Sequence, residues 1–312
     1  MRGKKLVFAG TPDFACPSLR ALHDAGHEIA LVITQPDRPR GRGCRMTAPA
    51  VKIEAERLEL EIIQPELLDS DGMHSRLGLL APEAVIIVAY GQKIPPWLLA
   101  LPPLGCLNVH ASLLPAYRGA APIQRAILNG ATHTGVTIMQ LDAGWDTGPL
   151  INQEIVDIDP LENAGSLHDR LAAAGAVLLV KALSGLASGA LKPVCQDGAL
   201  ATIAPKIKGE ETRISWRESA ARLHNLVRAL APAPLAETFH GEKRLQIIRT
   251  EPRAHQDGGN PGDVIQVSPE GVFVQTGHGI LLLAEVKPEN GRFMTAAAYA
   301  RGHRLLPGVR LK

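Results

Sequence analysis

Two large polar side chains stand two residues apart at the end of an apolar segment. Asn108 and His110 alternate with Leu107 and Val109, so in an extended strand both point to the same face. Buried strands of parallel sheets are usually unbroken apolar runs, and this pair therefore predicts a functional site. An amide N–H and an imidazole N–H can both donate to the oxyanion that forms when an amine attacks a carbonyl carbon. The alternative is that the two side chains only hydrogen-bond neighbouring loops.

A carboxylate follows the next predicted strand. Asp146 stands in the segment 141–148, where Gly144 and Gly148 allow a tight turn and a close approach of the backbone to a ligand. Neighbouring strands of a parallel sheet would bring Asp146 close to His110, where a carboxylate favours the protonated imidazole and orients the ring. Asp146 can then help to move the proton that an attacking amine loses.

Two other chemistries fit the sequence less well. Cys106 has the strand parity of Asn108 and His110, but no basic residue flanks it to activate a thiolate. Ser112 does not stand in a G-x-S-x-G motif. A dinucleotide oxidoreductase would need G-x-G-x-x-G after the first strand, where Gly10 is the only glycine. The sequence therefore predicts neither covalent catalysis nor dinucleotide chemistry.

The first two thirds of the chain alternate apolar strands with helical segments. The predicted strands are 6–9, 29–34, 84–89, 106–109 and 136–141, and the predicted helices are 14–25, 50–60 and 123–128. This alternation indicates an α/β fold, with a Rossmann-like parallel sheet covered on both faces. Ligands of such sheets bind beyond the carboxyl ends of the strands, where Asn108, His110 and Asp146 are expected.

From residue 167 onward the chain has a different pattern. A helix at 167–186 leads into a segment rich in glycine, proline and small residues, and a second helix follows at 219–230. Short strands at 245–250, 262–267, 271–275 and 280–286 then succeed one another without helices, which indicates a small OB-like antiparallel β-barrel. We predict a catalytic domain at 1–189, a linker at 190–208 and a C-terminal barrel domain at 209–312.

The overall composition is typical of a soluble globular protein. Apolar residues make up 46% and charged residues 21% of the chain, and no continuous apolar run approaches the roughly 20 residues of a membrane span. The first apolar stretch is too short for a signal peptide and ends in a Thr-Pro-Asp turn, so a cytoplasmic location is expected. Four scattered cysteines without a C-x-x-C pair indicate neither a zinc site nor a redox motif.

Basic residues are concentrated in two regions. Residues 205–312 contain 16 Lys and Arg against 11 Asp and Glu, a net charge of +5, whereas residues 1–204 carry −3. The segment 36–45 contains Arg38, Arg40, Arg42 and Arg45. Arginine suits phosphates and stacks on RNA bases, so both regions predict contact with a polyanion. The alternative is a cluster of charges that is merely solvated.

Several motifs along the chain resemble those of a known family. The matching segments are 8–14 (FAGTPDF), 34–39 (TQPDRP), 41–43 (GRG), 88–91 (VAYG), 108–115 (NVHASLLP), 118–124 (RGAAPIQ) and 135–140 (GVTIMQ). Over nearly its whole length the chain resembles the folate-dependent formyltransferase family. The first two segments and the C-terminal barrel narrow the resemblance to the members that act on methionyl-tRNA. The chain departs from many of them at Ala111, at Ile203 and at 231–234.

The resemblance implies a reaction and a set of site residues. The reaction transfers the formyl group of 10-formyltetrahydrofolate, a co-substrate, to the α-amine of methionyl initiator tRNA for translation initiation. No metal and no permanently bound cofactor are implied. The implied catalytic residues are Asn108, His110 and Asp146. The implied folate-binding residues are Ser112, Leu113, Leu114, Pro115, Ala89, Tyr90, Gly91 and Asp142. The implied tRNA-binding residues are Arg38, Arg40, Arg42, Arg45, Lys206 and Lys208, with Arg42 as the direct reader.

Two other functions stay open. Another folate-dependent formyltransferase, or a 10-formyltetrahydrofolate hydrolase, would use the same centre on a small amine or on water. A non-catalytic RNA-binding module belongs to a different class and would need cationic loops, but no polar groups at the strand ends. The sequence shows no signal for oligomerisation, and a monomer is expected.

Overall fold

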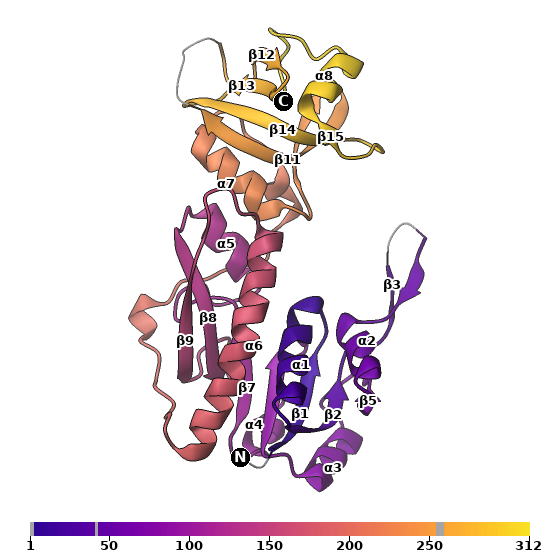
Figure 1. Ribbon diagram of the computed structural model, residues 1–312, viewed down its shortest axis with the longest axis vertical. Coiled ribbons are helices and arrows are strands. Elements are labelled where there is room, and N and C mark those ends of the chain that lie inside the picture. The colour runs from indigo at the N-terminus through magenta and orange to yellow at the C-terminus, as the bar shows by residue number, and fades with distance from the viewer. Residues whose placement is uncertain (1–2, 41–42, 254–258) are drawn as a thin grey trace. The chain divides into compact units, whose positions relative to one another are not determined.

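A computed structural model describes residues 3–40, 43–253 and 259–312 of the chain (Figure 1). The chain forms two compact units. The first unit comprises Met1–Gly119, Thr134–Val156 and His168–Ile203, and the second comprises Ala120–His133, Asp157–Leu167 and Ala204–Lys312. The second unit thus includes two short segments that lie well before the C-terminal third. The domain boundaries given above stay a prediction.

The first unit is built on a seven-stranded sheet with the order β5-β2-β1-β6-β7-β8-β9. The strands are β1 (Lys5–Gly10), β2 (Glu28–Ile33), β5 (Ile62–Ile63), β6 (Ala84–Val88), β7 (Cys106–His110), β8 (His133–Gln140) and β9 (Leu150–Asp157). All five residues of β6 are buried, which explains its unbroken apolar sequence. The strands from β5 to β7 are parallel. The predicted α/β class with a Rossmann-like sheet is confirmed, and the sheet is mixed, because β8 pairs with β7 in the antiparallel direction.

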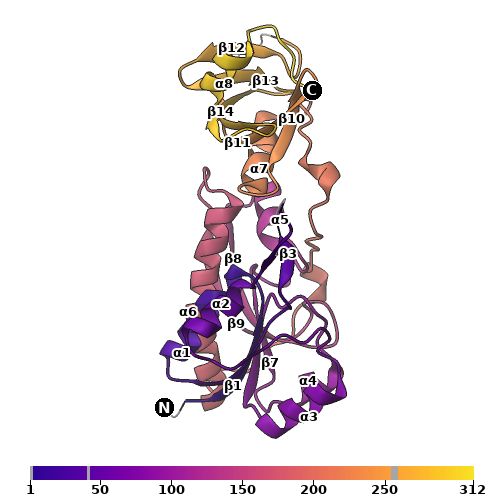
Figure 2. The same ribbon diagram turned by 90° about the vertical axis from the view of Figure 1, so that its right-hand side faces the viewer.

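Helices cover both faces of this sheet. They are α1 (Cys16–Asp24), which follows the short η1 (Asp13–Ala15), α2 (Ala50–Arg57), α3 (Asp71–Leu80), α4 (Pro96–Ala100) and α6 (Ala164–Ser188). Figure 2 shows α1 and α6 on one side of the sheet and α3 and α4 on the other. Gly175 lets α6 approach the strands closely, because a Cβ atom there would lie 2.7 Å from Cγ1 of Val109 and 3.1 Å from Cγ1 of Val136.

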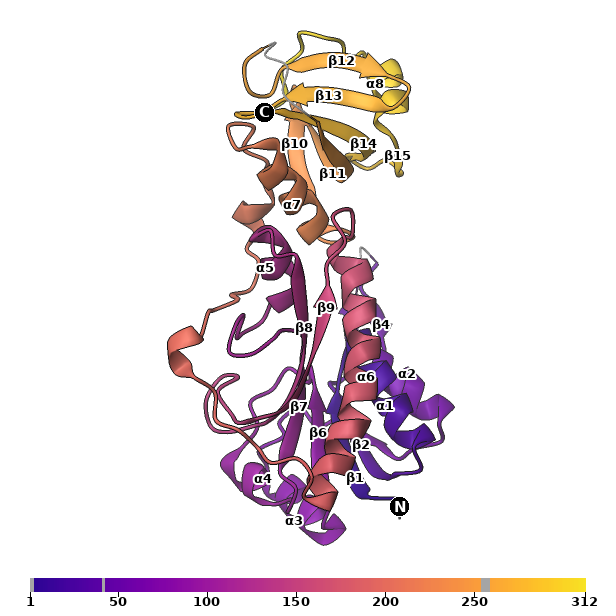
Figure 3. The same cartoon turned by 60° about the vertical axis from the view of Figure 1, so that its left-hand side comes forward.

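Helix α6 runs along the sheet beside β7, β8 and β9 (Figure 3). Among the described residues it is the one helix that is long and apolar enough to cross a membrane, with a mean hydropathy of 1.8 over its most apolar 18-residue window. Lys181 interrupts its apolar sequence, so the helix contains no continuous apolar run of about 20 residues. Leu167, Leu171, Leu179 and Leu183 are fully buried, so the composition reflects packing of α6 in the core of the protein.

The second unit combines two packed helices with an antiparallel sheet. Helix α5 (Pro122–Leu128) packs against α7 (Ala220–Leu230). The sheet order is β10-β11-β14-β13-β12, with β15 paired to β14. The remaining elements are β10 (Ala236–His240), β11 (Lys243–Arg253), β12 (Val264–Ser268), β13 (Gly271–Gln275), β14 (Ile280–Pro288), β15 (Met294–Thr295), α8 (Ala296–His303) and the short η3 (Gly209–Thr212). The short η2 (Gly198–Leu200) belongs to the first unit. This antiparallel sheet confirms the predicted class of the C-terminal part.

The last four residues join the two edges of this sheet. Phe239, on edge strand β10, exchanges two backbone hydrogen bonds with Lys312, at 2.9 and 3.0 Å. At the other edge, Val264 of β12 donates to the carbonyl of Val309 at 2.9 Å. Both edges of the sheet are therefore paired, as in a barrel, which leaves fewer unpaired backbone groups for association with another chain.

The packing of α1 against α2 depends on one buried carboxylate, Glu54. Its side chain accepts hydrogen bonds from Nε of Arg20 at 2.9 Å and from a terminal guanidinium nitrogen of Arg57 at 2.7 Å. The two guanidinium groups lower the pKa of Glu54 from 4.5 to about 2. Because the folded-state pKa is lowered, the stabilisation is present above pH 4.5 and is lost as the pH falls towards 2.

Replacing Glu54 with glutamine should therefore destabilise the protein by about 1–3 kcal/mol at pH 7, the scale of a hydrogen bond to a charged group. The difference in the free energy of unfolding between wild type and variant should shrink as the pH is lowered to 3. Urea unfolding at both pH values measures this difference. Glu56→Gln, at an exposed position of the same helix, is the matched control. A difference for Glu54→Gln that does not change with pH would contradict the assignment.

Candidate active site

Strand β7 carries the first two predicted catalytic residues. Asn108 lies opposite Ile87 of β6, and His110 lies opposite Thr137 of β8. The side chain of His110 is only 7% exposed, and its Nε2 donates to the carbonyl oxygen of Tyr117 at 3.1 Å. The Asn108 amide makes no hydrogen bond to any residue within the described ranges. The strand thus combines a ring of fixed orientation with an amide that is available to a ligand.

The structure brings Asp146 close to His110. Oδ1 of Asp146 lies 3.8 Å from Nδ1 of the imidazole, and Oδ2 accepts a hydrogen bond from the Gly119 N–H at 2.8 Å. The distance of 3.8 Å is too long for a direct hydrogen bond, so a reacting group or a water molecule can approach Nδ1 beside the carboxylate. The catalytic roles of Asn108, His110 and Asp146 stay a prediction.

The physical reason for this proximity differs from the one expected. Because β8 is antiparallel to β7, its last residue, Gln140, lies opposite Leu107, three residue pairs away from the level of His110. The loop after β8 must therefore cover about 10 Å along the sheet to reach His110. Gly148 lets the loop close on itself, since a Cβ atom there would lie 1.9 Å from the carbonyl oxygen of Gln140. The loop, and not a parallel strand end, positions Asp146.

Asp142, a predicted folate-binding residue, stabilises this loop from within. Its Oδ1 accepts hydrogen bonds from the Gly144 N–H at 3.0 Å and from Oγ1 of Thr147 at 2.7 Å. Asp142 is exposed, and Trp145 beside Asp146 exposes 81% of its surface. The loop therefore presents its residues to solvent while its own backbone is ordered by Asp142.

Several polar groups of the segment from Ser112 to Pro115, which is predicted to bind folate, form hydrogen bonds with other residues of the protein. Oγ of Ser112 is fully buried and donates to the Ala116 carbonyl at 2.6 Å. Thr137 donates to the Ser112 carbonyl at 2.6 Å and accepts from the Leu114 N–H at 3.1 Å. Ser112 is thus a structural residue of this loop, whereas Leu113 and Pro115 are partly exposed and can contact a ligand.

The other predicted folate-binding residues follow strand β6. The chain turns sharply there, because Ala89 has φ +47° and Gly91 has φ +90°. Tyr90 is buried between them, and desolvation raises the pKa of its hydroxyl to about 12. Its carbonyl accepts hydrogen bonds from Oγ1 of Thr11 at 2.9 Å and Nε2 of Gln35 at 3.3 Å. Of these three predicted residues, Ala89 and Gly91 are exposed.

The arginine-rich segment forms a hairpin and not the loop expected. Strand β3 (Arg38–Arg40) pairs with β4 (Arg45–Thr47), and Arg40 lies opposite Arg45. Arg38 and Arg45 are exposed, and neither has an ion pair within the described part of the chain. Arg42 lies outside the described residues. Exposed arginines such as Arg38 and Arg45 suit an anionic partner.

The base of this hairpin is anchored at Asp37. Its carboxylate binds Nζ of Lys52 at 2.9 Å and accepts a hydrogen bond from Nε2 of Gln64 at 2.7 Å. These hydrogen bonds, that of Gln64 above all, lower the pKa of the Asp37 carboxyl. The hairpin therefore starts from an ordered position on the first unit.

Lys206 and Lys208, in the second unit, are exposed on a segment that Arg125 fixes. Arg125 donates to the Pro205 carbonyl at 3.0 Å and forms two hydrogen bonds with the Glu211 carboxylate, at 2.6 and 2.9 Å. This pairing lowers the pKa of Glu211 to about 2. Lys208 lies 3.7 Å from Glu210, and Lys206 makes no ion pair within the described ranges.

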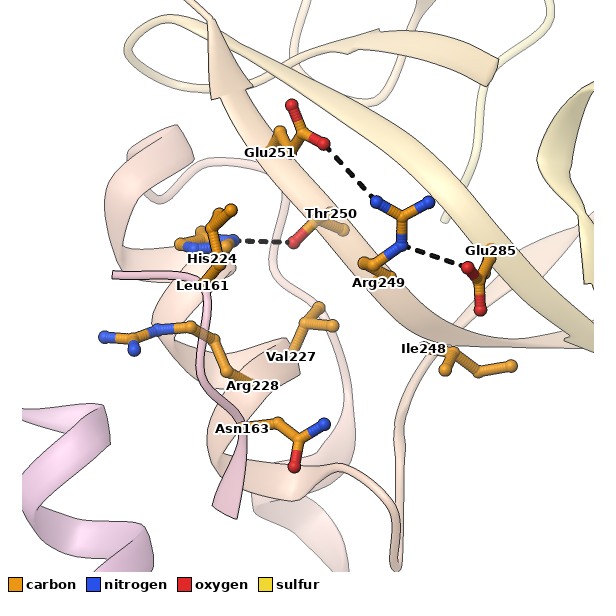
Figure 4. A pocket seen from close by; sticks show the side chains of 10 residues that line it. All are labelled: Leu161, Asn163, His224, Val227, Arg228, Ile248, Arg249, Thr250, Glu251 and Glu285. Carbon is orange, nitrogen blue, oxygen red and sulfur yellow. Dashed lines mark hydrogen bonds and ion pairs between the residues drawn. The ribbon is translucent and has the colours of Figure 1, made fainter. Parts of the chain in front are cut away.

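A cavity of about 160 Å³ lies in the second unit, which does not contain the predicted catalytic residues (Figure 4). Its polar side chains pair with one another: Nδ1 of His224 lies 3.0 Å from Oγ1 of Thr250, and Nε of Arg249 donates to Glu285 at 3.0 Å. Burial lowers the pKa of His224. The contact of His224 with Thr250 joins α7 to β11, and that of Arg249 with Glu285 joins β11 to β14. No group of three or more potential metal ligands occurs among the residues that the structure describes.

Cys106 is unsuited to nucleophilic catalysis. It is 1% exposed, its Sγ donates to the Leu98 carbonyl at 3.3 Å, and burial raises the pKa of the thiol to about 12. Cys106→Ala should therefore keep turnover within about twofold of wild type, because a buried structural thiol is inert. Steady-state formyl transfer measures this, with the melting temperature as a control for folding. A folded variant without activity would restore the covalent mechanism.

Residues that the motifs did not single out complete the site. The Tyr117 carbonyl orients His110, and Arg118 together with Gln196 contacts the loop of Asp146. Gln196 lies 50 residues from Asp146 in the segment predicted to be a linker, so no local pattern could reveal it. The resemblance contained Arg118 within a matching segment, but gave it no role.

Comparisons with known proteins identify the family of the chain. Residues 4–183 match the formyl transferase family, and residues 206–304 match the formyl transferase C-terminal domain. The methionyl-tRNA formyltransferase of Solibacter usitatus is 47% identical over 307 residues, which cover 98% of each chain. The methionyl-tRNA formyltransferase of Desulforamulus reducens is 42% identical over 306 residues, covering 98% of this chain and 96% of the relative.

A solved structure shares the fold. HypX from Aquifex aeolicus in complex with tetrahydrofolic acid is similar with a TM-score of 0.65 at 18% identity, over 96% of this chain and 47% of HypX. The chain thus spans about half the length of HypX. With both family matches and full-length relatives above 40% identity, the chain belongs to the formyl transferase family, in the branch of the methionyl-tRNA formyltransferases.

Proposed function

We propose that this formyl transferase moves the formyl group of 10-formyltetrahydrofolate onto the α-amine of methionyl initiator tRNA. The observation that carries the proposal is the convergence of Asn108, His110 and Asp146, with the His110 ring fixed by Tyr117 and 3.8 Å from the carboxylate. The relatives named methionyl-tRNA formyltransferase, which match almost the whole chain, support the choice of acceptor. A monomeric, cytoplasmic enzyme without a metal or a permanently bound cofactor is part of the proposal.

The geometry suggests how these residues divide the reaction. The amine nitrogen forms a bond to the formyl carbon, and the bond from that carbon to N10 of the folate breaks. The amine loses one proton and N10 gains one, so the reaction is balanced. The Asn108 amide and Nδ1–H of the protonated His110 donate to the oxyanion that develops on the formyl oxygen. Asp146 stabilises the imidazolium and accepts the proton from the amine.

The folate would contact the exposed residues that follow β6 and β7. Ala89 and Gly91 are exposed after β6, and Leu113 and Pro115 are partly exposed after β7. The Asp142 loop supplies the remaining predicted contact. In this proposal Ser112 and Tyr90 act through the shape of their loops, because both side chains are buried.

The tRNA would bind the arginines of the β3–β4 hairpin and the basic C-terminal region. Exposed Arg38 and Arg45 are available for phosphates, and Lys206 and Lys208 extend from the segment that Arg125 fixes. Arg42 stays the proposed direct reader by resemblance alone. The net charge of +5 over residues 205–312 is suited to backbone phosphates, whose contribution to affinity falls with salt.

The experiment that tests the acceptor is formylation of initiator and elongator methionyl-tRNA, compared at equal concentrations. The proposal predicts a clear preference for the initiator tRNA. Equal use of both would contradict the initiator assignment. Consumption of the folate without formylation of either tRNA would favour an acceptor of another kind, or the hydrolase.

Replacing both Arg38 and Arg45 with alanine should weaken binding of methionyl initiator tRNA by roughly tenfold, because two phosphate contacts are lost. The affinity for folate should stay unchanged, since these arginines are on the hairpin and not on the loops after β6 and β7. Filter binding at two salt concentrations measures the first quantity, and equilibrium dialysis of the folate measures the second. Arg76→Ala, an exposed arginine on α3, is the control. Equal losses for both ligands would argue against the role of the hairpin.

A further inference from the structure

The segment predicted to be a linker is paired with the loops of the candidate site. Leu150 and Val194 exchange two backbone hydrogen bonds, each of 2.8 Å. At the other end of the segment, the Arg118 N–H donates to the Thr202 carbonyl at 2.8 Å, and the Thr202 N–H donates to the Pro115 carbonyl at 3.3 Å. Residues 194–202 therefore lie along both the Asp146 loop and the loop that follows β7.

Gln196 makes the central contact of this segment. Its Nε2 donates to the carbonyl oxygens of Asp146, at 2.9 Å, and of Gly148, at 2.8 Å. Both hydrogens of the amide are thus used on the loop that carries the carboxylate. The two carbonyls lie on either side of Thr147, so one side chain fixes the backbone on both sides of this residue.

Arg118 fixes the orientation of the Gln196 amide. Its Nε and one terminal nitrogen donate to Oε1 of Gln196 at 3.1 and 2.7 Å. A guanidinium can only donate hydrogen bonds, so the amide oxygen must face Arg118 and the amide nitrogen must face the two carbonyls. The contacts therefore form a directed chain from Arg118 through Gln196 to the backbone of Asp146 and Gly148.

The conformation of Asp146 shows why such a contact matters. Asp146 has φ +52°, in the left-handed region that residues with a side chain seldom adopt. Strained conformations of this kind persist only where surrounding contacts determine them. Here the Gly119 N–H fixes the carboxylate and Gln196 fixes the carbonyl of the same residue. Loss of Gln196 would leave the side chain with its partner but free the backbone.

We infer that Gln196, oriented by Arg118, is a positioning residue for Asp146 in formyl transfer. The inference rests on the proposed catalytic role of Asp146. Gln196 acts through the backbone of the loop and needs no contact with either substrate. The segment between the two family matches, residues 184–205, then positions a catalytic residue in addition to linking the two matched regions.

Gln196→Ala should lower the rate of formyl transfer by about 10- to 100-fold, the scale of a misplacement of a catalytic group by about 1 Å. Gln196→Glu should lose at least as much, because a carboxylate can still bind Arg118 but has no hydrogen to donate to the two carbonyls. The Glu variant also serves if the Ala variant fails to fold. Asp197→Ala is the matched control, since among the described residues the Asp197 side chain accepts a hydrogen bond only from the Ala199 N–H of the same segment, at 2.9 Å. It should keep wild-type turnover.

A double-mutant cycle with full-length protein, under single-turnover conditions, separates positioning from a general structural effect. In the Asp146→Ala background, Gln196→Ala should cost less than about twofold, because contacting residues that act as a unit are not additive. The full loss in that background would overturn the inference. If Gln196→Glu keeps wild-type turnover while Asp146→Ala is inactive, the inference about Gln196 is overturned and the catalytic role of Asp146 stands. Near-normal turnover of Asp146→Ala would overturn the proposed catalytic role, and the inference with it.

Discussion

Asn108→Ala and His110→Ala should each lower the turnover of formyl transfer by about 10²–10³, the scale for loss of one oxyanion donor. Each substitution removes an N–H group that is directed at the developing negative charge. The His110 ring is 7% exposed and fixed by the Tyr117 carbonyl, so its donor is already oriented before the substrate arrives. The Asn108 amide has no competing partner among the described residues.

Steady-state kinetics with both substrates measures this effect. Turnover should fall while the Michaelis constants for folate and tRNA change little, because the lost hydrogen bond exists mainly in the transition state. His110→Gln is an informative second variant, since its amide can still donate to the oxyanion but cannot become cationic beside Asp146. Near-normal formylation by either alanine variant would contradict the assignment of the site.

Asp146→Asn should lower turnover by about 10²–10⁴, the range for loss of a general base. The asparagine side chain has the same size and its oxygen can still accept the hydrogen bond from Gly119, so the loop should keep its conformation. It cannot accept a proton or stabilise a cationic His110. The substitution therefore distinguishes the effect of the carboxylate charge from that of the hydrogen bond with Gly119.

Turnover across pH and the melting temperature of Asp146→Asn should be measured together. The proposal predicts a slow but stable enzyme. If the variant is both unstable and slow, Asp146→Glu tests whether a displaced carboxylate restores part of the rate. A stable Asp146→Asn variant with wild-type turnover would exclude the carboxylate from proton transfer.

The elements with continuous or periodically spaced apolar residues could be predicted from the sequence alone. Strands β1, β2 and β6 and helices α5, α6 and α7 lie close to their predicted positions, because hydrophobic periodicity reports burial directly. The less apolar elements were not predicted. Helix α3 buries only Met73 and Leu77, and β9 buries only Ile151 and otherwise alternates between half-buried and exposed residues.

The direction and the pairing of the strands could not be predicted from the sequence. An apolar run at β8 is equally compatible with a parallel or an antiparallel partner, and only the structure shows that β8 reverses against β7. The β3–β4 hairpin likewise depends on a register between short polar segments and not on composition. The contacts of Gln196 join residues 50 and 78 positions apart, and no local pattern encodes them.

The prediction of the catalytic residues rests on two different signals that coincide. Asn108 and His110 interrupt an apolar run with period-two spacing. This local signal does not depend on the direction of the neighbouring strands. Asp146 was placed near them on the assumption of a parallel sheet, and the structure reaches the same proximity by a loop. The tRNA contacts were suggested by clusters of charge, which indicate a partner but not its position.

The most direct test of the central claim is single-turnover transfer of a labelled formyl group from 10-formyltetrahydrofolate to methionyl initiator tRNA. With excess wild-type enzyme, the account predicts that the label is recovered on the α-amine of the methionine, and that His110→Ala slows its appearance by about 10²–10³. Label that stays on the folate, or that appears as free formate with the tRNA unmodified, would contradict the account.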